Sequence, residues 1–345
     1  MTEITQPSSY SLTDRLDAEA LASAAPSQAQ LMKELRVKSR PGWTSRLPPG
    51  LAAFATNPKG MTGVIILVAL ILFSIFGPML SDYNPNRRAG GPHVMPSQEH
   101  VLGTTRMGKD VFTQLAYGGR ISLAVGFGAG FTAALIGLAV GISAGYFGGR
   151  IDDILTFFVN VVLVLPGLPL IIVIATMVET ASPWVIGVVL AATGWGWSAR
   201  TIRTQTLSLR TREFVLSAEL LGEKKWRIIL IEIFPNMLSF FMSGLVLGTI
   251  AAILAEAALE FIGLGDPNAI TWGTMLFWAQ NNLALQSNAW WEIWPPCIAI
   301  MLTGAALVMV NFSVDEITNP QLRASRKIGR IKKFLTRRGR SADVF

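Results

Sequence analysis

The chain has 345 residues, of which 51% are hydrophobic and only 15% are charged. This composition excludes an ordinary soluble domain of comparable length and predicts a protein that crosses a membrane several times. The net charge of +7 is spread unevenly and does not indicate nucleic-acid binding, and a single cysteine, Cys297, excludes an internal disulfide.

The first 60 residues are polar and contain no apolar run of the roughly 20 residues that a spanning helix needs. They also lack the basic, apolar and small-residue order of a cleaved signal peptide. We therefore expect a retained N-terminal tail, 1–60. Five basic residues lie between Lys33 and Arg46, and two interpretations remain for them: contact with anionic lipid headgroups, or a solvated linker.

Six apolar stretches follow, and they predict six transmembrane helices. Helices are expected because lipid offers the backbone no hydrogen-bond partners, which leaves a closed barrel as the only alternative. The predicted spans are 61–80, 121–147, 154–178, 184–199, 237–262 and 293–313. A basic tail, 314–345, ends the sequence. Two interpretations remain for it: contact with lipid, or contact with a partner ATPase.

Two of these spans carry unusual residues. Gly137, Gly141 and Gly145 recur every fourth residue in the second span, a spacing that is typical of closely packed helices. Pro166 and Pro169 are expected to break or kink the third span. Such a kink either frees carbonyl groups to line a pathway or only lets two helices cross.

The distribution of lysine and arginine predicts the orientation. The segments on one side, 1–60, the connection at Arg150, 200–236 and 314–345, hold 24 of these residues, whereas 81–120 holds five and 263–292 holds none. Positive residues accumulate on the cytoplasmic side. Both termini and the segment 200–236 are therefore expected in the cytoplasm.

Within this polar segment, residues 212–236 form a predicted helical hairpin between the fourth and fifth spans. Phe214, Ala218 and Leu221 are spaced to share one face of a short helix, and Gly222 stands where that helix would end. A second amphipathic piece begins near Trp226. A compact knob of this kind can lie in a groove of another protein.

The hairpin resembles the coupling loop of binding-protein-dependent ABC importer permeases. The family pattern is Glu-Ala-Ala, three residues, Gly, nine residues, Ile-x-Leu-Pro. Ser217 and Ala218 occupy the alanine positions, Gly222 the glycine position and Phe-Pro at 234–235 the Leu-Pro position, whereas Leu216 replaces the glutamate.

Three further segments resemble the dipeptide and oligopeptide permeases of that family. HVLGTTRMGKDV begins at His100, Gly-Tyr-Phe-Gly-Gly occupies 145–149, and LAEAALEFIGLGDPNAITWGTML runs from Leu254. Thr105 and Lys109 replace an aspartate and an arginine of the family pattern. Together the four segments extend the resemblance over residues 58 to 323.

The resemblance implies the type I permease fold of ABC importers, with a cytoplasmic coupling helix between spans 4 and 5. It implies a subunit of the bacterial cytoplasmic membrane that forms half of a pathway for short peptides. The implied partners are a second homologous permease subunit, two ATP-binding subunits or domains, an extracytoplasmic substrate-binding protein and membrane lipids. The residues expected to couple to the ATPase are Glu213, Phe214, Ser217, Ala218, Leu221, Gly222, Trp226 and Pro235.

Glu256 and Glu260 lie one helical turn apart near the end of the fifth span. Carboxylates are costly in a membrane and usually have a reason. Two interpretations remain: an outer gate of the pathway, or a helix end that reaches headgroups and water, with Glu256 paired across the bundle. The tryptophans of 263–294 are interpreted as an aromatic belt at the membrane surface.

No phosphate-binding G-x-x-x-x-G-K-[ST] motif occurs in the sequence, and we expect no catalytic residues. No cofactor is expected on this chain; ATP and Mg²⁺ are expected on the partner ATPases. His93 and His100 lack neighbours at metal-ligand spacing, so no metal site is expected. Oligosaccharides or a nickel complex are alternative substrates, and a secondary transporter is the remaining alternative class.

Overall fold

The computed structural model describes residues 54–55, 57–165, 167–177 and 182–318. The chain divides into two compact units, Met1–Thr56 and Asn57–Phe345, and the helices named below all belong to the second. Most of the predicted N-terminal tail, almost all of the C-terminal tail and Pro166 lie outside the described residues.

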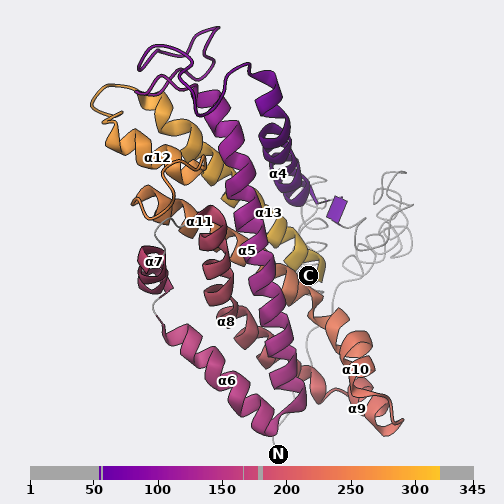
Figure 1. Cartoon of the computed structure of the whole chain (residues 1–345). Coiled ribbons are helices and arrows are strands. Elements are labelled where there is room, and N and C mark those ends of the chain that lie inside the picture. The colour runs from indigo at the N-terminus through magenta and orange to yellow at the C-terminus, as the bar shows by residue number, and fades with distance from the viewer. Residues whose placement is uncertain (1–53, 56, 166, 178–181, 319–345) are drawn as a thin grey trace, which may run out of the picture. The chain divides into compact units, whose positions relative to one another are not determined.

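Every regular element in the described part of the second unit is a helix, which confirms the all-α class (Figure 1). One isolated bridge, between Thr104 and Asp110, is the sole extended pairing there. The helices are α4 (Pro58–Phe76), η2 (Gly77–Leu80), α5 (Val111–Phe147), α6 (Gly149–Val164), α7 (Gly167–Met177), α8 (Pro183–Arg210), α9 (Glu213–Leu220), α10 (Lys225–Arg227), η3 (Ile228–Ile233), α11 (Phe234–Phe261), α12 (Trp272–Asn281), η4 (Trp290–Glu292) and α13 (Trp294–Thr318).

Four helical stretches among the described residues are long and apolar enough to cross a membrane. They are Pro58–Leu80, Val111–Phe147, Lys225–Phe261 and Trp290–Glu316. The predicted span 154–178 is covered instead by two shorter helices: α6, which ends at Val164, and α7, which begins at Gly167. The predicted span 184–199 lies within α8, whose second half carries Arg200, Arg203 and Arg210.

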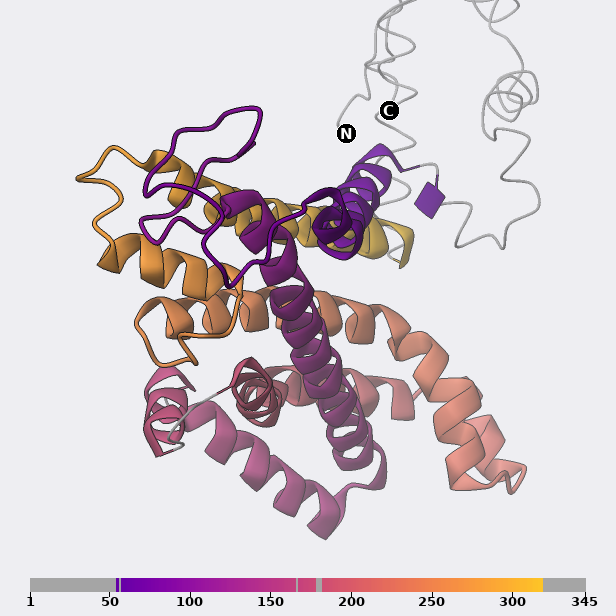
Figure 2. The same ribbon diagram turned by 45° about the horizontal axis from the view of Figure 1, so that its top comes forward.

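The long helix α5 is the centre of the second unit. It packs along α8 and α11, while α4 packs against α13 (Figures 1 and 2). The helix begins at Val111 and not at Ile121 because the Asp110 carboxylate caps it, accepting the Thr113 amide hydrogen over 2.8 Å. This cap therefore starts the helix ten residues earlier than the predicted span.

The glycine stripe of α5 faces α8. A β-carbon added to Gly137 would lie 2.7 Å from the Ser198 β-carbon, and one added to Gly145 would lie 2.6 Å from the Thr206 β-carbon. The glycines therefore let the two helix backbones approach closely, as the four-residue spacing predicts.

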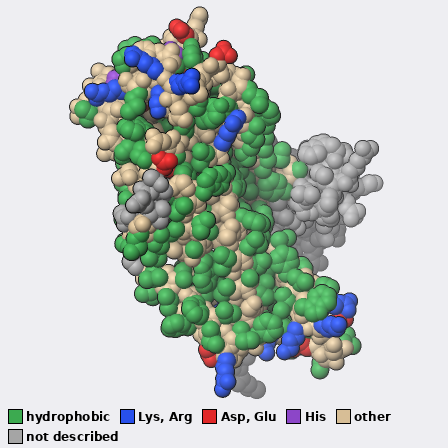
Figure 3. All heavy atoms as spheres, in the orientation of Figure 1, with side chains coloured by type: hydrophobic (Ala, Val, Ile, Leu, Met, Phe, Trp, Pro, Cys, Tyr) green, Lys and Arg blue, Asp and Glu red, His purple; other side chains and the backbone are tan. Residues whose placement is uncertain are grey.

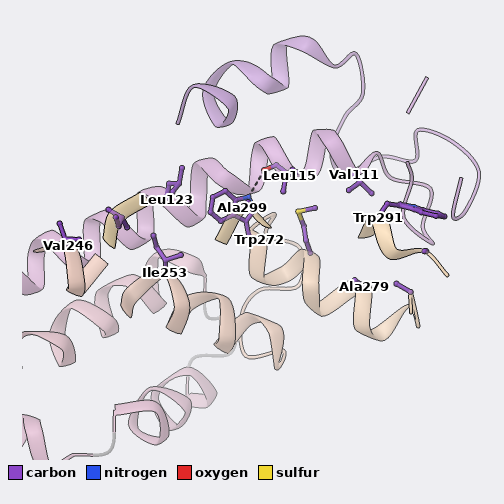
Figure 4. Packing of buried hydrophobic residues seen from close by; sticks show 13 residues of the cluster. Val111, Leu115, Leu123, Val246, Ile253, Trp272, Ala279, Trp291 and Ala299 are labelled. Atoms are coloured by element: carbon purple, nitrogen blue, oxygen red, sulfur yellow. Dashed lines mark hydrogen bonds between the residues drawn. The ribbon is translucent and has the colours of Figure 1, made fainter. Parts of the chain in front are cut away.

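Trp272, the first residue of α12, is buried against α5, where its indole nitrogen donates to the Leu115 carbonyl over 3.1 Å (Figure 4). Trp291 is also buried, and it donates to the Thr104 carbonyl over 3.0 Å. The aromatic-belt interpretation is wrong for these two residues, because a buried indole needs a hydrogen-bond partner and both find one inside the protein.

Candidate functional site: an exposed helical elbow

The hairpin folds as a helical elbow, which we define as α9, α10 and η3, residues 213–233. Its first helix ends in a Schellman motif: the Gly222 amide donates to the Glu219 carbonyl, and the Glu223 amide donates to the Ala218 carbonyl. Gly222 has a φ angle of +76°, which glycine adopts without a steric penalty. The chain therefore turns back at the predicted position.

The tip of the elbow is apolar and open to its surroundings. Leu220 is 89% exposed, Leu221 83% and Trp226 59%. Charged residues of both signs lie near these side chains in the sequence, among them Lys224, Lys225 and Glu223. Figure 3 shows charged side chains beside hydrophobic ones at this end of the molecule. Exposed large apolar groups with a polar rim are typical of a protein contact surface.

The structure brings the predicted coupling residues together on this elbow, except for Pro235, which lies at the start of α11. Ala218 is half-buried, whereas the others lie on the surface: Glu213, Phe214, Ser217, Leu221, Gly222, Trp226 and Pro235. Leu216, at the position of the family's glutamate, is 46% exposed. The elbow therefore presents an apolar side chain where a family member would present a charge.

The residues that anchor the elbow were missed by the sequence reasoning. Phe214 and Leu221 do not form its buried face; Val215, Ile228 and Ile233 do, with at most 1% of each exposed. They pack in one hydrophobic cluster with residues of α5, α8 and α11. Their only sequence signal is that all three are β-branched and apolar.

A salt bridge joins α6 to α8. The Arg203 guanidinium donates to both carboxylate oxygens of Asp152, over 2.5 and 2.6 Å, and Thr156 donates to the same carboxylate over 2.9 Å. The hydrogen bonds from Arg203 hold the pKa of Asp152 below its ordinary value of 3.8, against the opposing effect of burial. The same pair raises the pKa of Arg203.

We expect Asp152→Asn to lower the free energy of unfolding by about 1 kcal/mol at pH 7, because a two-pronged, partly buried pair is worth more than an exposed one. A carboxyl group with a lowered pKa in the folded state stabilises the fold at pH values above its unfolded pKa. This stabilisation is lost as pH falls through the folded pKa. The difference from wild type should therefore begin to shrink as pH falls below about 4, the unfolded pKa, and should vanish only below the lower folded pKa. Denaturant unfolding at pH 7 and pH 3.5 measures it, with the exposed neighbour Asp153→Asn as control. An equal loss in both variants would contradict the pairing.

Glu256 and Glu260 are both buried in the protein, 0% and 1% exposed. Ser122 of α5 donates to Glu256 over 3.2 Å, and Thr271 donates to Glu260. Neither side chain therefore reaches water from this subunit, and the carboxylates join α11 to α5 and to the start of α12. Among the other pathway candidates, Pro169 lies exposed in the first turn of α7, where proline is tolerated.

Comparison with known proteins places the chain in a class. Residues 137–324, more than half of the chain, match the family described as binding-protein-dependent transport system inner membrane component, and residues 51–97 match the N-terminal TM domain of oligopeptide transport permease C. The chain belongs to this family of transport-system membrane components. The resemblance found in the sequence is thereby confirmed.

The chain matches individual relatives over most of their length. The chain is 36% identical to the dipeptide transport system permease protein DppC of Bacillus subtilis over 272 residues, which are 77% of this chain and 83% of that protein. It is 32% identical to the oligopeptide transport system permease protein OppC of the same organism over 78% and 88% of the two chains. It is also 32% identical to OppC of Mycobacterium bovis, over 80% and 94%. The chain is thus a permease subunit of an ABC transport system and a multi-pass membrane protein.

Proposed function

We propose that this permease subunit forms half of a pathway that imports short peptides, delivered by an extracytoplasmic binding protein, across a bacterial cytoplasmic membrane. The proposal is supported by the similarity to dipeptide and oligopeptide permeases. The second half of the pathway would come from a homologous permease subunit. Two ATP-binding subunits or domains, carrying ATP and Mg²⁺, would supply the energy.

The elbow carries the coupling in this proposal. Its apolar tip, Leu220, Leu221 and Trp226, seats in a groove of an ATPase subunit. Docking is favourable because it removes these exposed apolar side chains from water. The positive residues of 200–236 support a cytoplasmic elbow, and the proposal puts both termini on the same side of a bundle of six spans. The exposed apolar tip is the single observation on which the coupling role depends.

ATP-driven closure of the ATPases then moves the elbow, and the attached helices exchange an inward-open for an outward-open arrangement. For the pathway we propose the connection between α6 and α7, which contains Pro166, together with Pro169 in the first turn of α7, as an element that lines it. Glu256 and Glu260 hold its outer end by joining α11 to α5 and α12.

Reconstitution of the complete complex in proteoliposomes tests the proposal. We expect a labelled di- or tripeptide to accumulate only with the binding protein and ATP on their proper sides, and not after Mg²⁺ is removed. An ionophore that collapses ion gradients should leave uptake unchanged, because no gradient drives it. Uptake that needs a gradient and no ATP would indicate a secondary transporter. Uptake of an oligosaccharide or nickel complex in place of peptides would overturn the substrate class alone.

A further inference from the structure

Two side-chain contacts join the elbow to the last turn of α5. The Tyr146 hydroxyl donates to a carboxylate oxygen of Glu219 in α9 over 3.1 Å. The Lys225 ammonium lies over the Phe147 ring, 5.9 Å from its centre. Tyr146 is itself buried, only 3% exposed, whereas Glu219 is exposed. A buried group of the second predicted span therefore holds a surface group of the elbow.

The apolar side of the elbow belongs to the same junction. Val215, Ile228 and Ile233 share one buried cluster with Ile142 and Tyr146 of α5, Ile202 of α8 and Met237 of α11. Because close-packed clusters transmit displacement and do not deform smoothly, movement of the elbow displaces the ends of these helices together.

The elbow is joined to α11 through the backbone, and to α5 through side chains. The last part of the elbow, η3, is a π-helical turn, and Pro235 at the start of α11 has no amide hydrogen to donate. Wide helical turns of this type occur at functional sites more often than elsewhere. The helix nevertheless runs without a break from Lys225 to Phe261. The second limb of the elbow is therefore oriented by α11, whereas α9, before the turn at Gly222, is held by side-chain contacts with α5.

We propose that Tyr146 is a positioning residue for energy coupling: its hydrogen bond to Glu219 fixes the elbow on α5, so that displacement of the elbow by the ATPase moves α5. This inference rests on the coupling role proposed above. Only the hydroxyl is required, since the ring packs in the cluster with or without it. The acceptor must be an oxygen on residue 219, and its charge is not essential.

The test uses the reconstituted complex and measures peptides imported per ATP hydrolysed. Tyr146→Phe keeps the ring and removes the donor. We expect the ratio to fall roughly fivefold, because the loss of one ordinary hydrogen bond changes an equilibrium constant by about that factor. Glu219→Leu removes the acceptor and should cause the same loss, whereas Glu219→Gln keeps an acceptor oxygen and should restore coupling. The double variant Tyr146→Phe/Glu219→Leu should lose no more than either single variant, because both remove one interaction.

Tyr117→Phe, at the opposite end of the same helix, is the matched control and should leave the ratio unchanged. Wild-type ratios in both Tyr146→Phe and Glu219→Leu would overturn the inference. An equal loss in Glu219→Gln and Glu219→Leu would also overturn it, because charge and not the hydrogen bond would then matter.

A cross-link separates this inference from the coupling role itself. In a Cys297→Ser background, which removes the single native cysteine, Lys224→Cys carries a photoreactive maleimide at an exposed position beside the apolar tip. Cross-linking to an ATPase subunit in every variant, together with the expected ratios, supports the inference. Cross-linking with unchanged ratios refutes the inference alone. No cross-link to an ATPase, even without the Tyr146 and Glu219 changes, refutes the coupling role.

Discussion

Gly130→Val is expected to prevent stable folding of the permease, whereas Gly128→Val, two residues away in the same helix, is expected to be tolerated. A β-carbon at Gly130 would lie 2.6 Å from the backbone nitrogen and α-carbon of Thr249. Backbone atoms cannot rotate away as a flexible side chain can, so α5 and α11 would have to separate. We expect a loss of about 3 kcal/mol or more, at the upper end for overpacked cores.

The control removes helix propensity from this comparison, because both variants replace glycine by the same β-branched residue within α5. Around Gly128, apart from the adjacent residues and the nearby backbone of α5 itself, no atom lies within 4 Å of the added β-carbon. Thermal unfolding and protease resistance of the detergent-solubilised complex measure the difference. Equal stability of the two variants would show that α5 and α11 do not cross as closely as the structure places them.

Gly222→Trp is expected to leave the subunit folded and to uncouple ATP hydrolysis from peptide uptake. Apart from its two neighbours in the chain, no residue has an atom within 4 Å of a β-carbon at this position, so the indole projects into open space. The positive φ angle of +76° adds only a local strain of about 1–2 kcal/mol for an L-residue. A bulky side chain at the turn, however, keeps the apolar tip from seating in the ATPase groove.

We expect uptake to fall about tenfold or more, which corresponds to a loss of roughly 1.4 kcal/mol in productive docking, while the complex still hydrolyses ATP. Gly222→Asn is the matched control, since asparagine adopts the left-handed conformation more readily and is small. It should retain most uptake. Full transport by the tryptophan variant would count directly against the elbow as the coupling element.

The local features of the elbow were predictable because they depend on short-range chemistry. Gly222 ends α9 in a left-handed conformation, and the exposed apolar residues around it follow from an amphipathic pattern. The side of α9 that is buried was not predictable. Val215 and Phe214 are adjacent and both apolar, and only the position of α5 and α8 decides that Val215 is enclosed.

The carboxylates of α11 show the same division. Their proximity follows from helical spacing, whereas their environment does not. Glu256 meets Ser122, which is 134 residues earlier in the chain, and Trp272 is buried against Leu115. An interface position for Trp272 was the reasonable expectation, because a sequence pattern cannot indicate which aromatic residue a distant helix will cover.

The sequence by itself determined the membrane class, the family and the place of the elbow, because hydropathy, positive residues and short motifs act through neighbours along the chain. The tertiary structure alone decided what holds the elbow. The Tyr146–Glu219 hydrogen bond joins residues 73 positions apart, and the buried cluster gathers side chains from five helical segments. Such contacts arise from packing between helices, which depends on how distant surfaces fit together.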